Sequence, residues 1–121
     1  MATVLVDNGK KAIIAALNTA DPKHVGWGTG AGTSGETDTT LFTEAAEDRV
    51  AGTKSIVTTV KADDTYQVVA EMTSESEQTV TNAGLFAGEA GDLIVKGDFT
   101  GVPLAIGDKI EFTIKIQQTN G

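Results

Sequence analysis

The chain has 121 residues, of which 40% are hydrophobic and 21% charged, a composition that predicts one globular domain with its own core. It has no cysteine, which excludes disulfides and thiolate metal sites. Its net charge of −8 argues against nucleic acid as a partner, because duplex binders need a basic face. No apolar run approaches the ~20 residues that cross a bilayer, and Met1–Lys11 lacks the basic-then-apolar order of a signal peptide. We therefore expect no membrane partner.

A β-prone segment opens the chain. Met1–Asp7 contains Ala2–Val6, an uncharged stretch for which the sequence indicates no structural role within its own chain. It could add a strand to the edge of a partner's sheet, or it could pair within its own sheet. At the other end, Thr119–Gly121 is expected to be a loose tail, so that one domain spans residues 1–121.

The pattern predicts one short helix, at Asp7–Thr19. Asp7 or Asn8 can cap it, since a short side-chain oxygen accepts an N–H of the first turn. Asp21-Pro22 should end it, because the residue before a proline is pushed out of the α region. The expected apolar stripe consists of Ala12, Ile13, Ala16 and Leu17.

Glycines dominate the next stretch. A short strand is expected around His24–Trp27, followed by a flexible loop at Thr29–Gly35. A helical turn over Asp38–Glu47 would be anchored by Leu41 and Phe42.

From Arg49 onward the pattern predicts strands. Lys54–Val60 is rich in β-branched residues, and Tyr66–Met72 alternates between apolar and polar positions, so a turn at Ala62–Thr65 makes them a hairpin. Further strand segments follow at Thr79–Val80, Leu85–Phe86, Leu93–Phe99, Leu104–Ile106 and Ile110–Ile116, the last preceded by a turn at Gly107-Asp108. Several short strands with turns between them predict a mainly β fold, an antiparallel β-sandwich or barrel, with one short N-terminal helix.

Residues with catalytic chemistry are few. His24 is the single histidine, which favours a loop or interface role over a catalytic triad or zinc site. The glycine-rich run Gly26–Gly32 lacks the G-x-G-x-x-G spacing of a dinucleotide-binding loop. A mobile or tightly turning loop is the favoured interpretation. The acidic pair Asp63-Asp64 suits a turn, and Glu75 with Glu77 suits a solvated face. We therefore predict no catalytic, cofactor-binding or metal-binding residue, with a calcium site and a carboxylate hydrolase as the weaker alternatives.

Partner contacts are the more promising kind of site. Trp27, flanked by glycines, is either an exposed contact or a residue packed against the sheet, and the second interpretation is favoured. The candidate contact residues are Ala2, Thr3, Val4, Leu5, Val6, Trp27, Thr29 and Thr33.

Several segments in a fixed order resemble a family of small virion structural proteins of tailed bacteriophages. The resemblance runs from the helix at Gly9–Thr19 to the last strand, with one departure at Asn82, where members often carry Glu. Its segments are Val25–Gly30, Thr39–Glu44, Arg49–Thr53, Thr65–Val69, Asn82–Phe86, Gly97–Phe99 and Gly107-Asp108.

The resemblance implies a jelly-roll-like sandwich and a non-enzymatic capsid decoration, or cement, protein without cofactor. Its partners would be the major capsid protein of the same phage and further copies of itself, as a dimer or trimer. It would be made in the host bacterial cytoplasm and end on the capsid surface of the virion. The alternative is a tail-fibre or collar-associated module that binds a virion partner or a host surface glycan.

Overall fold

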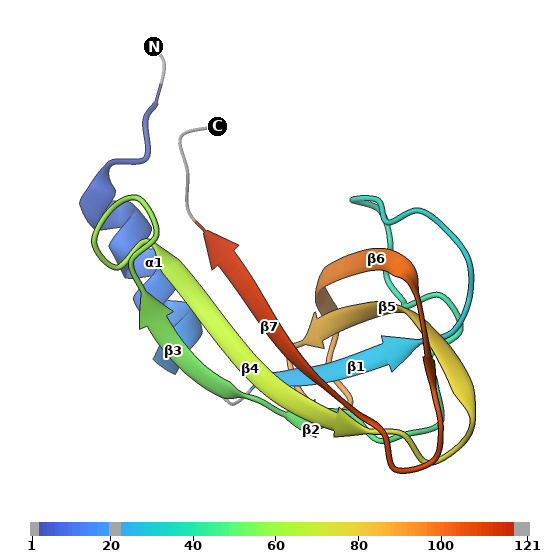
Figure 1. The fold of residues 1–121 in the computed structure, drawn as a ribbon. Helices are drawn as coiled ribbons and strands as arrows, with labels where there is room; N and C mark the ends of the chain where they lie inside the picture. The colour runs from blue at the N-terminus through green and yellow to red at the C-terminus, as the bar shows by residue number, and fades with distance from the viewer. Residues whose placement is uncertain (1–2, 20–22, 118–121) are drawn as a thin grey trace.

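The protein, seen here in a computed structural model that describes residues 3–19 and 23–117, consists mainly of antiparallel strands (Figure 1). Ala2, Asp21-Pro22 and Thr119–Gly121, to which the sequence predictions refer, lie outside the described residues. The elements are α1 (Asp7–Thr19), β1 (His24–Gly28), β2 (Val50–Ala51), β3 (Thr53–Val57), β4 (Thr65–Thr73), β5 (Gln78–Phe86), β6 (Leu93–Leu104) and β7 (Lys109–Gln117).

The strands form two sheets. The four-stranded sheet has the order β2-β1-β5-β6, the three-stranded sheet has the order β3-β4-β7, and every pair within them is antiparallel. The predicted mainly β fold with one short helix is confirmed, and the arrangement is that of a β-sandwich. The jelly-roll-like order is not confirmed, because a jelly roll has eight strands and the described residues form seven.

Two places join the sheets. Gly52 links β2 to β3, where an added Cβ would lie 2.2 Å from Cγ1 of Val68, so only glycine lets the strand cross here. At a second corner, β4 continues into β5 and β6 into β7. The Ser74 N–H donates to the Asp108 carbonyl at 2.7 Å, and the Gly107 N–H donates to the Ser74 carbonyl at 2.8 Å. From this corner the two sheets diverge (Figure 1).

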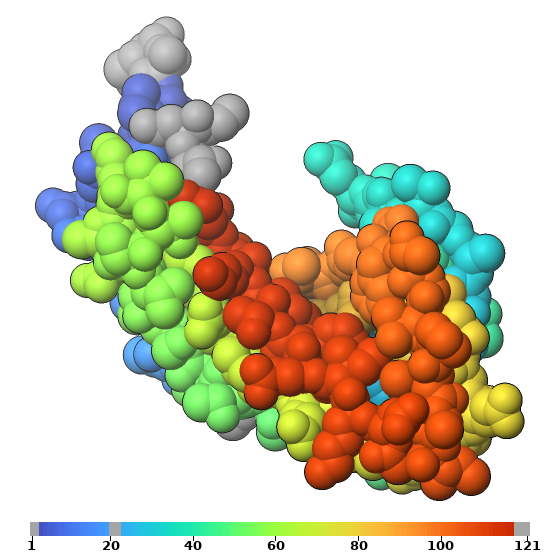
Figure 2. Space-filling model, viewed as in Figure 1, coloured from blue at the N-terminus to red at the C-terminus, as the bar shows by residue number. Residues whose placement is uncertain are grey.

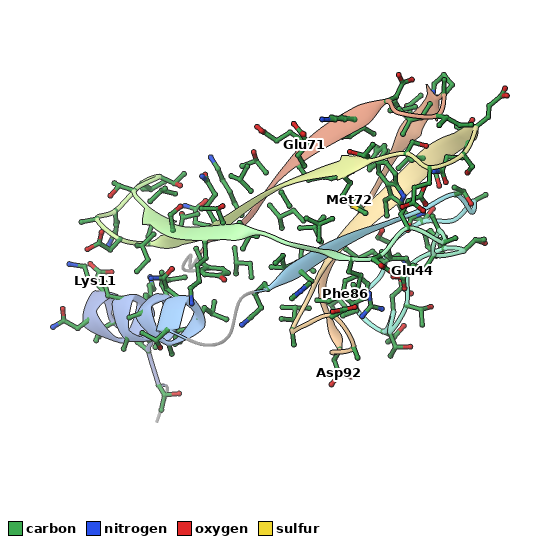
Figure 3. The ribbon with its side chains drawn as sticks, turned by 90° about the horizontal axis from the view of Figure 1, so that it is seen from below. Lys11, Glu44, Glu71, Met72, Phe86 and Asp92 are labelled. Atoms are coloured by element: carbon green, nitrogen blue, oxygen red, sulfur yellow. The ribbon has the colours of Figure 1, made fainter. Side chains whose placement is uncertain are left out.

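The core lies between the sheets. Alternation along β4 sends Met72 into the core while Glu71 points to solvent on the other face (Figure 3). Fully or almost fully buried residues from both sheets meet there: Val25, Trp27, Tyr66, Val68, Ala70, Met72, Val80, Ala83 and Leu85.

Helix α1 covers part of the three-stranded sheet. Its bounds are as predicted, and it contacts β3 and β4. The predicted apolar stripe is wrong: Ala12, Ile13 and Ala16 are exposed. The face toward the sheet is Lys10, Ile14 and the half-buried Leu17, spaced i, i+4, i+7. The buried face thus includes the aliphatic stem of Lys10, a residue that the predicted stripe did not contain.

The outer face of the four-stranded sheet is covered by residues 29–49, which we call the covering segment. The predicted helical turn in this segment is wrong. Asn82 Nδ2 donates to the Phe42 carbonyl at 3.1 Å and Asn82 Oδ1 accepts from the Phe42 N–H at 3.0 Å. Because this backbone bonds to the sheet, it does not form i→i−4 bonds. Leu41, as expected, anchors the segment and is 4% exposed.

Glycines on that face make room for the covering segment. An added Cβ would lie 2.5 Å from the Phe42 carbonyl oxygen at Gly28, and 3.0 Å from Leu41 Cδ2 at Gly84. The sheet register pairs Gly26 with Gly84, which completes a floor without side chains. Trp27, between Gly26 and Gly28, points to the opposite face and enters the core.

The predicted hairpin is present as β3 and β4. Its connection, residues 58–64, is held by Asp64, whose carboxylate accepts from the N–H groups of Thr59, Val60 and Lys61 at 2.9, 3.1 and 3.0 Å. These bonds keep the pKa of Asp64 far below its usual value, against the effect of burial. Asp63 adopts a positive φ of 55°, as expected of Asp in a turn.

The later strands are longer than predicted. Thr79–Val80 and Leu85–Phe86 belong to one strand, β5, with register irregularities after Val80 and Leu85. Strand β6 continues through Pro103, because it lies at the edge of its sheet and needs no partner on its outer side.

Candidate interaction surface

A groove opens between the diverging sheets, and the space-filling view shows the molecule hollowed between β6 and β7 (Figure 2). Its volume is about 240 Å³. Its lining is mostly apolar and comes from β5, β6 and β7: Ala83, Gly84, Val95, Lys96, Gly97, Phe99, Phe112, Thr113 and Ile114. We call this the apolar groove.

The apolar groove carries no free charge. Lys96 is its one charged residue, and its ammonium turns to the outer face of the sheet. There it lies 3.0 Å from Asp38 Oδ2 and 3.2 Å from the centre of the Phe42 ring. Asp38 accepts from the Gly35 N–H and from Lys96, and both bonds hold its pKa below the usual value. The groove is therefore a neutral surface on a chain of net charge −8.

Two strand edges flank the groove, since β6 and β7 are each the last strand of their sheet. The residues Ile110, Phe112, Ile114 and Ile116 point inward, as the alternation predicted, but they are only half-buried. Phe99 is 38% exposed, and its ring centre lies 6.4 Å from that of Phe112. An edge strand leaves a row of N–H and C=O groups for a further strand. The groove thus combines apolar contacts with backbone hydrogen-bonding capacity.

The N-terminal segment, residues 3–6, lies outside both sheets. It leaves α1 pointing away from the body of the molecule (Figures 1 and 3). Val4 is 77%, Leu5 44% and Val6 63% exposed. Leu5 is the least exposed because its side chain lies over Gly9, where an added Cβ would meet Leu5 Cδ1 at 2.8 Å. Of the predicted contact residues, Thr3, Val4, Leu5 and Val6 are therefore accessible; Asp7, assigned to the arm, belongs to α1.

Trp27 is not an exposed contact. It is 1% exposed, and its ring stands edge-on to Phe112, with 6.2 Å between ring centres. Its Nε1–H donates to Glu47 Oε1 at 3.2 Å. The inclusion of Trp27 among the contact residues is wrong, because the alternation of β1 turns the ring into the core. The favoured interpretation, that it packs against the sheet, is confirmed.

Glu47 is a buried carboxylate. Besides Trp27 it accepts hydrogen bonds from the Glu75 N–H at 2.9 Å and from the Gln78 side chain. Burial raises the pKa of Glu47, but these bonds, the one from Glu75 foremost, outweigh it and hold the pKa below its ordinary value. The carboxylate ties the end of the covering segment to β1 and to the β4–β5 connection.

The other predicted contacts, Thr29 and Thr33, lie in the covering segment. Thr29 is half-buried, and its N–H donates to the Thr43 carbonyl at 3.0 Å. Thr33 is exposed in the same segment. The next residue, Ser34, is fixed by its N–H bond to Asp98 Oδ1 at 2.8 Å, and this bond lowers the pKa of Asp98. Thr33 thus lies in an exposed loop that is held on both sides by the hydrogen bonds of Thr29 and Ser34.

The residues weighed for catalysis are not brought together. His24 is half-buried in β1, and its Nδ1 is buried without a hydrogen-bond partner. Asp63 and Asp64 form a turn, as predicted, while Glu75 and Glu77 are exposed in the β4–β5 connection. Within residues 3–19 and 23–117, no three His, Cys, Asp or Glu side chains are placed to hold a metal ion. No helix in this part of the chain is long and apolar enough to span a membrane.

No protein-family model, curated protein or solved structure matches the chain. The fold and its surfaces are therefore the basis for a functional proposal, together with the resemblance of the sequence segments.

Proposed function

We propose that the protein is a non-enzymatic structural protein of a tailed-bacteriophage virion that decorates and cements the capsid. Its partner is the major capsid protein, bound on the outside of the shell. The observation that carries the proposal is the exposed loop around Thr33, which the covering segment presents on a rigid sheet.

The covering segment supports the same proposal. Thr33 is exposed. The segment is held to the sheet by hydrogen bonds from Ser34 to Asp98 and from Phe42 to Asn82, and by a β-bridge between Glu44 and Gly28. A loop presented by a rigid scaffold is a common position for binding residues. The net charge of −8 keeps the free protein soluble and favours a basic partner surface.

The test is co-sedimentation of the purified protein with emptied heads of the phage that encodes it. We expect saturable binding at a fixed copy number per capsomer and a raised melting temperature of the heads. The variant Thr33→Asp should weaken binding, while Ser76→Asp, an equal change at an exposed position in the β4–β5 connection, should not. Absence of wild-type binding to heads would overturn the proposal.

A tail-fibre or collar module is the second candidate, and Phe99 is the observation that favours it. This exposed ring beside Phe112 offers an aromatic face on which a sugar could stack. Saccharide binding that is lost in Phe99→Ala, with no binding to heads, would favour this candidate over capsid decoration.

A further inference from the structure

Two neutral, apolar surfaces of this acidic chain match each other in chemistry. One is the apolar groove, where Lys96 alone is charged and turns its ammonium away. The other is the N-terminal segment, residues 3–6, which carries no charge and belongs to neither sheet. On a chain of net charge −8, contact between these two surfaces avoids the repulsion that other contacts between copies would meet.

The edge of β7 is the more open of the two edges at the groove. Strand β6 carries Gly97, Gly101 and Pro103, and a proline at an edge hinders the addition of another strand. Its residue Asp98 is also engaged by the covering segment through Ser34. Strand β7 runs for nine residues, Lys109–Gln117, without glycine or proline. Its charged residues lie on the face away from the groove, since they alternate with the inward Phe112 and Ile114.

We propose that the N-terminal segment of one copy adds as a strand to the free edge of β7 in a second copy. Alternation in such a strand places Val4 and Val6 in the apolar groove and turns Thr3 and Leu5 outward. Val4 and Val6 are the two more exposed of the apolar side chains in the segment, whereas Leu5 already packs over Gly9.

A second copy is the occupant because the segment leaves α1 pointing away from both sheets of its own chain (Figures 1 and 3). Every copy has one segment and one groove, so the association either closes, as a reciprocal dimer or a ring, or continues as an open chain of copies. This inference goes beyond capsid decoration and holds whether or not the protein binds a shell.

Sedimentation velocity of the full chain over a range of concentrations tests the association. The wild type should sediment as a dimer or larger assembly. Gly97→Leu fills the groove, and a Cβ at Gly97 would meet nothing within 4 Å, so the fold should persist. We expect Gly97→Leu to raise the dissociation constant at least tenfold. Gly35→Leu, the matched control at another open glycine, should leave it unchanged.

The segment is tested by charge in the same assay. Val4→Asp with Val6→Asp should weaken association at least tenfold, because two charges would enter the groove. Thr3→Asp should have little effect, because Thr3 faces outward in the added strand. A wild type that stays monomeric at every concentration, or a Gly97→Leu variant that associates like the wild type, would overturn the inference.

Cross-linking identifies which segment occupies the groove, because the chain contains no cysteine of its own. A mixture of Val4→Cys and Gly97→Cys chains should form a disulfide between one chain of each kind under mild oxidation. A double variant that forms only an intrachain disulfide would show that the segment fills its own groove, and the inference would be wrong. No disulfide between positions 4 and 97 would overturn it as well.

Failure here is separable from failure of the proposed function. Association is measured without phage heads, and the Thr33→Asp variant, which probes head binding, leaves the segment and the groove intact. If chains associate through the groove but do not bind heads, this inference stands and capsid decoration falls.

Discussion

The two faces of the four-stranded sheet are covered to different extents. On the outer side, the covering segment lies on a floor of glycines, is bonded to Asn82, and through its own Glu47 accepts a hydrogen bond from Trp27. On the inner side, the core fills the space near the corner, but between β6 and β7 the chain leaves a neutral apolar groove. The chain thus seals one surface with its own residues and leaves a similar surface uncovered.

This difference predicts which substitutions change the free energy of unfolding and which change association. Covering backbone is favourable only if its N–H and C=O groups find partners, and Asn82 supplies them for Phe42. The groove needs no such bonds inside one chain, because the edge of β7 can bond to water. We therefore expect substitutions on the covered side to change stability, and substitutions in the groove to change association.

The largest effect is expected from Gly28→Val. A side chain there would collide with the Phe42 carbonyl oxygen, 2.5 Å from the added Cβ, and would force the covering segment off the sheet. We expect a loss of about 3 kcal/mol, as for severe overpacking, measured by urea unfolding. The control Gly97→Val, in the open groove of the same sheet, should change stability little. Equal losses in both variants would contradict the comparison between the two sides.

Glu47→Gln should rank second, because the amide would face donors from Trp27, Glu75 and Gln78. We expect a loss of about 2 kcal/mol at pH 7, as for a hydrogen bond to a buried charged group. The pKa of Glu47 is lowered on folding, so its stabilisation is present above its ordinary pKa of 4.5 and is lost as pH falls through the folded value.

The pH dependence is the sharper measurement of that residue. The difference in unfolding free energy between wild type and Glu47→Gln should be constant above pH 6 and should shrink below pH ~4.5. Glu77→Gln, the same change at an exposed carboxyl in the β4–β5 connection, serves as the control. A difference that stays constant down to pH 3 would show that Glu47 is not held ionised by these bonds.

Asn82→Ala removes both bonds to the Phe42 backbone and leaves that backbone without its partners. We expect a loss of about 1–2 kcal/mol in urea unfolding. Amide hydrogen exchange should become faster first at Phe42 and Gly30. The Phe42 N–H donates to Asn82, and the Gly30 N–H donates to the Phe42 carbonyl that Asn82 holds in place. Unchanged protection of these amides would show that the glycine floor alone holds the segment.

Arg49→Lys should have the smallest effect of these substitutions. Arg49 binds both carboxylate oxygens of Glu44 at 2.9 and 3.0 Å and lies over the Phe86 ring, 3.4 Å from its centre. Lysine keeps the charge but loses the paired bonds, at a cost of about 1 kcal/mol in thermal unfolding. Lys115→Arg on the outer face of β7 is the control and should be neutral. A loss above that of Gly28→Val would reverse the proposed order.

The sequence was sufficient for the local elements. Helix α1 has the predicted bounds, the hairpin β3–β4 lies where it was expected, and the alternation of Tyr66–Met72 gave the buried face of β4. These features depend on residues close in the chain, whose periodicity and turn chemistry can be read directly. Thr33 and Val4 are exposed, and their role as contact residues stays a prediction.

Tertiary structure decided the rest. Nothing near Phe42 in the sequence indicates that Asn82, forty residues further on, bonds to its N–H and C=O groups and prevents a helical turn. Trp27 is buried because its neighbours Gly26 and Gly28 are required on the other face, and Glu47 is buried because three distant donors converge on it. The apolar groove arises where β6 and β7, on different sheets, diverge from a shared corner. Local pattern sets which face of a strand is apolar, whereas the packing of distant segments decides whether that face is covered.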